Sequence, residues 1–224
     1  MIVHSLMRCL TEAGAFTWHP DDWTANRIIR AVKGDPFDGH FEVKIAGKRH
    51  RFDRSNVATF LPTLYNVVAA KMAATIPGRF EIVPIPSSTS VIGSADEFST
   101  LVAARMIASR LGHHRAEAVT GLVWRTPKIP AREGGSRDPQ QHFENLQVWQ
   151  RPTLPIVLYD HVMRTGSQMI AAYRRLLKDA TAPVAGFVLG RTVRFQRKKV
   201  IGWTAEDFPV VDEPINIDEL FGWT

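Results

Sequence analysis

The feature that most constrains the fold is an alternation, from residue 80 onward, between short continuous apolar runs and longer segments with helical spacing. Continuous apolar runs of this length are typical of strands that are buried on both faces of a sheet. The expected strands are Phe80–Ile85, Ala118–Trp124, Pro155–Asp160 and Val184–Leu189. The expected helices run from Ser94 or Ala95 to Leu111, over Pro139–Trp149 and over Gly166–Lys178. This order predicts an α/β fold in which a mostly parallel central sheet is covered by helices on both faces.

The first part of the chain is harder to interpret. Residues 41–52 alternate well enough to predict a hairpin that turns at Ala46-Gly47-Lys48. Apolar residues recur at helical spacing between Asn56 and Ile76, and Pro77-Gly78 should end that helix. We therefore expect three parts: an N-terminal segment or hood over 1–54, a core over 55–200 and an acidic tail over 201–224.

Length and composition indicate one globular domain. The 224 residues, 45% apolar and 22% charged, are enough for one generous core. No run approaches the about 18 consecutive apolar residues that a membrane-spanning helix needs. The first ten residues lack the apolar core and cleavage site of a secretory signal. Together with the single cysteine, Cys9, which we expect to be a buried filler, these features predict a cytoplasmic protein with no membrane partner.

Charge is distributed unevenly along the chain. The net charge is +6, but six acidic residues and no Lys or Arg follow Lys199, so the rest of the chain carries +12. Such a basic body favours polyanionic partners, namely phosphate esters, pyrophosphate or nucleic acid. The acidic tail could fold back on the body, bind a basic surface of a protein partner, or remain solvated. The sequence also permits a homo-oligomer.

The densest basic patch is Arg194–Lys199, in which Phe195 is interleaved with cations. Together with Arg174, Arg175, Lys178 and Arg191 it could follow a nucleic-acid backbone while the aromatic ring stacks on a base. The alternatives are a solvated face and a landing site for the acidic tail.

One segment carries most of the chemistry. The apolar run Ile156–Tyr159 ends at Asp160, and the turn Thr165-Gly166-Ser167 then begins a helical pattern. A carboxylate at the end of a parallel strand can accept hydrogen bonds from sugar hydroxyls or bind a hydrated Mg²⁺. Backbone N–H groups of a glycine-containing turn at a helix N-terminus can bind a phosphate. The same turn could equally be a plain helix cap.

This segment resembles the signature of type I phosphoribosyltransferases, in which four apolar residues, two acids and two apolar residues precede a Thr- and Gly-containing turn. Ile82–Ser88 is similar to the strand and pyrophosphate loop of that family, especially of its ComF-like branch. Arg137–His142, followed by Asn145, is a weaker match to the connection that bears Arg, Gln and Asn there. The resemblance extends over about residues 55–192.

The resemblance implies a glycosyltransferase that uses phosphoribosyl pyrophosphate and Mg²⁺, with a nitrogen nucleophile displacing pyrophosphate. Asp160 would bind a ribose hydroxyl and share the metal through the ligand. The 5-phosphate would lie in the turn formed by Arg164, Thr165, Gly166, Ser167 and Gln168. The pyrophosphate would face Ser87, Ser88 and Thr89, and a flexible loop would add contacts from Arg125, Lys128, Arg132 and Arg137.

Three positions depart from the family pattern. His161 replaces the second acid, Arg164 replaces a small hydroxyl residue or an acid, and Gln168 stands where Thr or Ser is usual. If catalysis survives, Asp160, His161 and Arg164 are its expected residues. Two further functions stay open: a non-catalytic sensor of a phosphorylated sugar or nucleotide that regulates a partner, and a module associated with nucleic acid.

Overall fold

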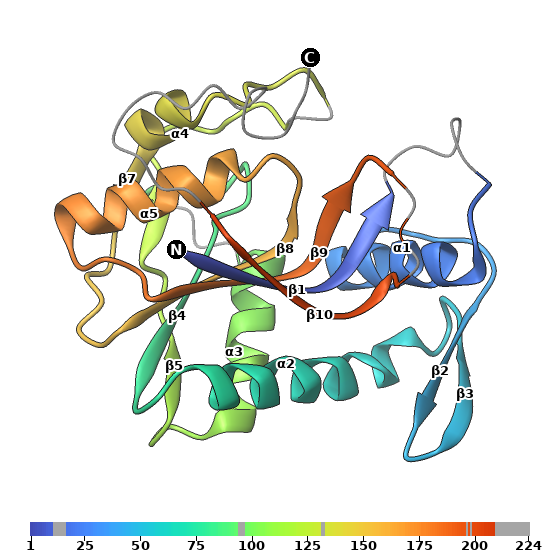
Figure 1. The fold of residues 1–224 in the computed structure, drawn as a ribbon. Helices are drawn as coiled ribbons and strands as arrows, with labels where there is room; N and C mark the ends of the chain where they lie inside the picture. Colours follow the sequence, from blue (N-terminus) through green and yellow to red (C-terminus); the bar gives the residue numbers. More distant parts are fainter. Residues whose placement is uncertain (11–16, 94–96, 131–132, 196, 198, 209–224) are drawn as a thin grey trace.

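The structure is a computed structural model that describes residues 1–10, 17–93, 97–130, 133–195, 197 and 199–208 (Figure 1). Its helices are α1 (Pro20–Lys33), the short 3-10 helix η1 (Val57–Thr59), α2 (Leu61–Thr75), α3 (Ser99–Leu111), α4 (Pro139–Asn145) and α5 (Ser167–Asp179). Its strands are β1 (Ile2–Leu10), β2 (Phe41–Ile45), β3 (Lys48–Phe52), β4 (Phe80–Pro84), β5 (Ala116–Ala118), β6 (Leu122–Trp124), β7 (Leu146–Val148), β8 (Ile156–Met163), β9 (Ala185–Val193) and β10 (Ile201–Asp207).

A six-stranded sheet forms the centre of the molecule, with the strand order β10-β1-β9-β8-β4-β5. Four of its five pairings are parallel, and only β10 runs antiparallel, beside β1. The predicted α/β class with a mostly parallel sheet is therefore confirmed.

Helices cover both faces of this sheet, as predicted. On one face, α1, α2 and α3 pack in a core around Phe80, Tyr159 and Phe187. On the other face, α5 and the small β6–β7 sheet pack around Leu158 and Val188. Figure 1 shows α2 and α3 on one side of the central strands and α5 on the opposite side.

The N-terminal strand is part of the central sheet and not of a separate hood. β1 lies between β9 and β10, in parallel register from Val3↔Gly186 to Leu10↔Val193. β10 closes the same edge, so residues 201–207 also belong to the sheet. These pairings differ from the predicted boundaries at residues 54 and 200, because strands far apart in sequence complete one sheet. The rest of the tail, 209–224, lies outside the described residues.

The expected hairpin is present as β2 and β3, joined by a two-residue turn. Ala46 and Gly47 both have positive φ, 49° and 81°, which is the backbone of the turn type that suits hairpin twist. The expected strand over 118–124 is instead divided. β5 ends at Ala118 in the central sheet, whereas β6 pairs antiparallel with β7, at the end of the segment predicted as one helix over 139–149.

One helical stretch, Val57–Thr75, is long and apolar enough to cross a membrane by length and composition alone. A helix in the core of a folded domain can meet the same criteria, and α2 contributes Leu64, Val68 and Met72 to the core beneath the sheet.

Glu81 on β4 offers a test of how the two central strands are held together. Its buried carboxylate accepts hydrogen bonds from the backbone N–H of Thr153 at 2.8 Å and of Leu154 at 3.3 Å, just before β8. We expect Glu81→Ala to lower the free energy of unfolding by about 2–3 kcal/mol, because two backbone donors lose a charged acceptor. Urea denaturation measures this loss.

Glu117 is the matched control, because it pairs with Glu81 in the β4–β5 register. Its carboxylate is 47% exposed, in an ion pair with Arg79. Glu117→Ala should therefore cost less than about 1 kcal/mol. Equal losses in the two variants would contradict the anchoring role of Glu81.

Candidate functional site

The strands β4 and β8 form a switch point in the sheet. They are parallel neighbours, but β4 continues through α3 to β5 at one side, and β8 continues through α5 to β9 at the other. The two connecting helices also lie on opposite faces. Ligands of open α/β sheets bind at the carboxyl ends of strands that diverge in this way. The loops after β4 and β8 are therefore the candidate site on topology alone.

Asp160 lies beside this opening. β4 ends at Pro84, which pairs with Tyr159, whereas β8 continues to Met163 along β9. The predicted strand end at Asp160 is thus three residues short, but from Asp160 onward β8 has no ladder partner on the β4 side. The half-buried carboxylate accepts a hydrogen bond from the backbone N–H of His161 at 2.7 Å. Burial raises the pKa of Asp160 to about 6, opposed by that N–H and by Lys33 and Lys128.

The loop after β4 begins next to Asp160, because the N–H of Ile85 donates to the Tyr159 carbonyl at 2.8 Å. Within the loop, the hydroxyls of Ser87 and Ser90 are hydrogen-bonded at 2.7 Å, and the N–H of Ser90 donates to the Ser87 carbonyl at 3.0 Å. The turn is therefore held by its own side chains. Ser87 and Ser88 are half-buried and Thr89 is exposed, and the role of this loop in binding pyrophosphate stays a prediction.

Among the predicted loop cations that the structure describes, Lys128 is the one that contacts the loop after β4 and interacts electrostatically with Asp160. Its backbone N–H donates to the Ser88 carbonyl at 2.9 Å, and its ammonium lies 4.7 Å from the centre of the Trp124 ring. Burial lowers the pKa of Lys128 to about 8, and the nearby Asp160 opposes that shift. An acid and a base whose pKa values both shift toward neutrality are typical of functional sites.

The other predicted loop cations are less constrained. Arg125 and Arg137 are exposed, and Arg132 lies outside the described residues. Asn145 holds the start of the loop, since its side-chain amide accepts from the N–H of Thr126 at 3.0 Å and donates to the Thr126 carbonyl at 2.9 Å.

His142 was not predicted as a site residue, yet it lies near Lys128. It is 5% exposed, and its ring meets Trp124 edge to face with centroids 5.8 Å apart. Burial, followed by the charge of Lys128, lowers its pKa to about 4. Its Nε2 has no hydrogen-bond partner among the described residues. The only sequence signal for this position was its place in the Arg137–His142 segment.

His161 does not lie at the rim of the sheet with Asp160. Adjacent strand residues point to opposite faces, and its ring packs with Tyr159 on the face covered by α1–α3. The Tyr159 hydroxyl and His161 Nδ1 are 3.2 Å apart, and the ring is 2% exposed. Burial lowers the pKa of His161 to about 3. The predicted part of His161 in ligand binding is therefore corrected: it is a neutral core residue.

The turn between β8 and α5 is covered by an aromatic side chain. Gly166 has φ +82°, and a Cβ placed on it would lie 2.1 Å from Cζ of Phe208. Phe208 is 1% exposed, and its backbone N–H donates to the Met1 carbonyl at 2.9 Å. The expectation that this turn is open to a phosphate is therefore corrected for the described structure, because Phe208 fills that space.

The side chains of the turn agree with this closure. Thr165 and Ser167 are buried, and their hydroxyls are hydrogen-bonded to each other at 3.0 Å. Gln168 is half-buried, and only Arg164 is exposed. Arg191 holds the turn in place, because its guanidinium donates to the Arg164 carbonyl and, at 2.8 Å, to Glu206 on β10.

The residues around Asp160 do not fit a magnesium ion held by the protein. Mg²⁺ needs oxygen ligands, usually one or two carboxylates with substrate phosphates and waters. Asp160 is a single carboxylate that already accepts an N–H and lies near the cation Lys128. No cluster of three His, Cys, Asp or Glu side chains suited to a metal occurs among the described residues.

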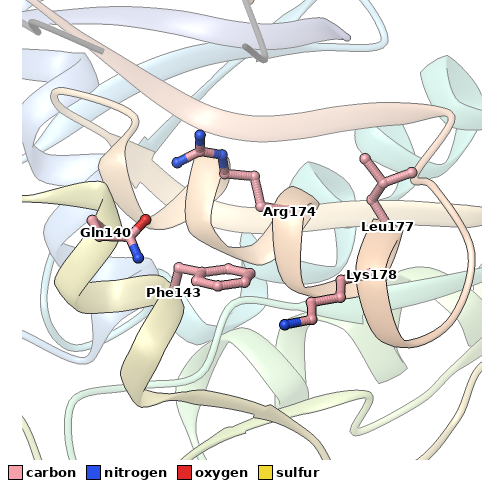
Figure 2. Close-up of a pocket in the computed structure, with 5 residues that line it drawn as sticks. All are labelled: Gln140, Phe143, Arg174, Leu177 and Lys178. Atoms are coloured by element: carbon pink, nitrogen blue, oxygen red, sulfur yellow. The ribbon is translucent and has the colours of Figure 1, made fainter. Parts of the chain in front are cut away.

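Among the described residues, cavities also lie away from the switch point. One, of about 340 Å³, is lined by Gln140 and Phe143 from α4 and by Arg174, Leu177 and Lys178 from α5 (Figure 2). The other, of about 840 Å³, lies between α1 and the β2–β3 hairpin.

Two of the cations that were predicted to support the basic patch around Arg194–Lys199 are instead buried and ion-paired. Arg175 is buried against Asp179 at 2.9 Å and over the Phe143 ring at 4.1 Å, and Arg191 is paired with Glu206. Phe195 is 64% exposed, while Gln196 and Lys198 lie outside the described residues.

Comparisons with known proteins give weak structural likenesses only. No family model and no curated protein matches the sequence. A UMP synthase from Leishmania donovani is 15% identical over 75% of this chain, with a TM-score of 0.36. An APRTase from Giardia lamblia in complex with 9-deazaadenine is 13% identical over 78% of this chain and 98% of its own, with a TM-score of 0.40.

An adenine phosphoribosyl transferase from Trypanosoma brucei, in complex with AMP, pyrophosphate and ribose-5-phosphate, is 14% identical over 75% of this chain and 79% of its own, with a TM-score of 0.37. The chain spans about a third, 31%, of the UMP synthase. At these TM-scores the likenesses do not establish a shared function.

The raised pKa of Asp160 predicts a pH-dependent cost to stability. Its folded pKa of about 6 exceeds the usual 3.8, so its contribution to stability is complete below about pH 4 and is lost as the pH rises through 6. We expect Asp160→Asn to be more stable than the wild type at pH 7, by up to about 3 kcal/mol.

Denaturant unfolding at pH 4 and pH 7 measures this difference. The difference in unfolding free energy between the wild type and Asp160→Asn isolates the effect of the carboxyl group. It cancels the effect of the buried histidines, whose lowered pKa values make stability rise with pH. A difference that does not change with pH would show that Asp160 is not desolvated.

The contact between Gly166 and Phe208 predicts a non-additive pair. Gly166→Ala should destabilise the protein by more than the roughly 1–2 kcal/mol of a left-handed backbone, because the new Cβ also displaces the Phe208 ring. In a Phe208→Ala background only the backbone cost should remain. A double-mutant cycle by urea unfolding measures the coupling, and additive losses would place Phe208 away from the turn.

Proposed function

We propose that this protein binds phosphoribosyl pyrophosphate, or a related 5-phosphorylated sugar or nucleotide, at the switch point between β4 and β8. The proposed reaction transfers the phosphoribosyl group to a nitrogen acceptor and releases pyrophosphate. One observation carries the proposal: where the two strands diverge, the loop after β4 is hydrogen-bonded to the carbonyl of Tyr159, next to Asp160, and to the backbone N–H of Lys128.

The chemistry follows from these groups. Asp160, with a pKa of about 6, is mostly ionised at pH 7 and can accept hydrogen bonds from ribose hydroxyls. Lys128 can place a positive charge on the pyrophosphate, whose oxygen takes the electron pair of the breaking anomeric C–O bond as the new C–N bond forms. Because the ammonium is partly desolvated, its interaction with that developing charge is stronger than it would be in water.

Hydroxyl and backbone groups of the loop at Ser87–Thr89 would orient the pyrophosphate. The exposed Arg125 and Arg137 could add contacts if the loop that carries them closes over the ligand. Such closure would also exclude water, which otherwise competes with the nitrogen acceptor.

A second function, ligand sensing, is favoured by Phe208. A 5-phosphate could reach the amides of Gly166 and Ser167 only after Phe208 moves. Phe208 directly follows β10, which is paired with β1 and held to Arg191 through Glu206. Binding at the turn would therefore change the C-terminal segment, and a binding protein that lacks catalysis could signal to a partner by that route.

Isothermal titration calorimetry with phosphoribosyl pyrophosphate, with and without Mg²⁺, tests the pocket. We expect Asp160→Asn and Lys128→Ala each to weaken binding by about tenfold or more, since each removes a charge-assisted contact. Lys178→Ala, which removes a cation beside the α4–α5 cavity, is the control and should bind like the wild type.

Release of pyrophosphate in the presence of purine or pyrimidine bases separates the two functions. Release that depends on Lys128 supports the transferase, whereas binding without release supports the sensor. Absence of binding by phosphoribosyl pyrophosphate, ribose 5-phosphate and pyrophosphate alike would overturn both.

A further inference from the structure

A hollow lies between α1 and the β2–β3 hairpin. We call it the hairpin groove: the hollow of about 840 Å³ between the first turns of α1 and the β2–β3 hairpin. Its walls include Trp23 and Arg27 from α1, His40 before the hairpin, and Lys44 and Arg49 from the hairpin strands. None of these residues belongs to the switch-point site.

An aromatic platform forms one wall of the hairpin groove. Trp23 is 42% exposed although it is a large apolar residue on an otherwise amphipathic helix. Trp18 packs against it with ring centroids 4.6 Å apart, and the Arg27 guanidinium lies 5.5 Å from its centre. Arg27 is itself oriented by a 2.9 Å hydrogen bond from its Nε to the Asp38 carbonyl. The indole is thus held by a second ring and a guanidinium, and its exposed part lines the groove.

The hairpin supplies positive charge to the opposite wall. Residues Lys48 to Arg51 of β3 are exposed, and Arg49 lines the groove. Because alternate strand residues share a face, Arg51 lies on the same face of the hairpin as Arg49. Arg49 and Arg51 pair in register with Lys44 and Glu42. Arg49 forms an ion pair with Glu42 at 3.8 Å on this face, but the two side chains are 76% and 47% exposed, so the pair neutralises little charge. Core packing does not account for these cations, because only Phe52 of β3 is buried.

We propose that the hairpin groove binds single-stranded nucleic acid. An exposed ring held by a second ring and a guanidinium is a surface on which an unpaired base can stack. The cations on the facing hairpin can contact the phosphates of a nucleic-acid backbone, and such contacts do not require an exact spacing. Duplex DNA would not use the indole, because its bases are stacked and paired within the helix. The groove therefore selects the single strand over the duplex.

The inference is independent of the proposed transferase or sensor function. The proposed nucleic-acid contact is the hairpin and not the segment Arg194–Lys199 that the sequence suggested. Arg175 and Arg191, which were expected to support that segment, are buried in ion pairs.

Fluorescence anisotropy with a labelled oligothymidylate of about 20 nucleotides, longer than one single-strand site, tests the proposal on the full chain. Arg49→Ala/Arg51→Ala should weaken binding about tenfold and reduce the slope of log K against log salt by up to about 1.4, because each lost phosphate contact removes about 0.7. Trp23→Ala should also weaken binding about tenfold, and Trp23→Phe should restore most of it because a phenyl ring still stacks.

Arg174→Ala/Lys178→Ala removes the same charge from the α4–α5 cavity and is the matched control. Unchanged binding in this variant, with loss in the hairpin variants, supports the groove. Equal losses in both pairs would show general attraction to a basic chain and overturn the proposal. So would equal competition by a duplex of the same length, full binding by Trp23→Ala, or no binding by the wild type.

Discussion

The parallel pairing of β4 with β8 is the constraint on which the rest of the structure depends. Its register runs from Glu81↔Ile156 to Pro84↔Tyr159. β4 therefore ends opposite Tyr159, and the next residue of β8, Asp160, lies beside the loop that follows β4. Glu81 strengthens the same pairing from the other end by accepting the N–H groups of Thr153 and Leu154. Without this register, the loop after β4 would not begin beside Asp160.

The same strand places its two polar residues in opposite environments. Asp160 lies where β8 has lost its β4 partner, and burial raises its pKa to about 6 against the opposing charges of Lys33 and Lys128. One residue later, His161 enters the core against Tyr159 and stays neutral. A pair of acids at these positions would put a carboxylate into that core, so the histidine is consistent with a site that works through one carboxylate. The closure of the turn by Phe208 is a separate feature, since it depends on β10 and not on β8.

Much of the fold could be predicted from local sequence patterns. The strands over 80–85, 155–160 and 184–189, the α2, α3 and α5 helices and the β2–β3 hairpin all appear, because apolar spacing and turn residues act within a few residues of one another. The errors are at places where distant segments decide. β1 has an apolar pattern, but nothing in that pattern identifies β9 as its parallel partner. β6 follows β5 closely in the sequence, yet in the described structure it pairs with β7. Asp160 and the loop at Ser87–Thr89 could be named as candidates from the sequence and stay predictions as site residues, whereas Phe208 gave no usable signal and His142 only a weak one.

By itself the sequence determined which segments are strands and helices, that the sheet is mostly parallel, and that an acid precedes a glycine turn, because each of these properties depends on short-range periodicity and backbone sterics. Only the tertiary structure decided that β4 and β8 are neighbours, that His161 faces the core, and that Phe208 covers Gly166. Those outcomes depend on contacts between residues far apart in the chain, and no local pattern encodes which side chain will fill a given space.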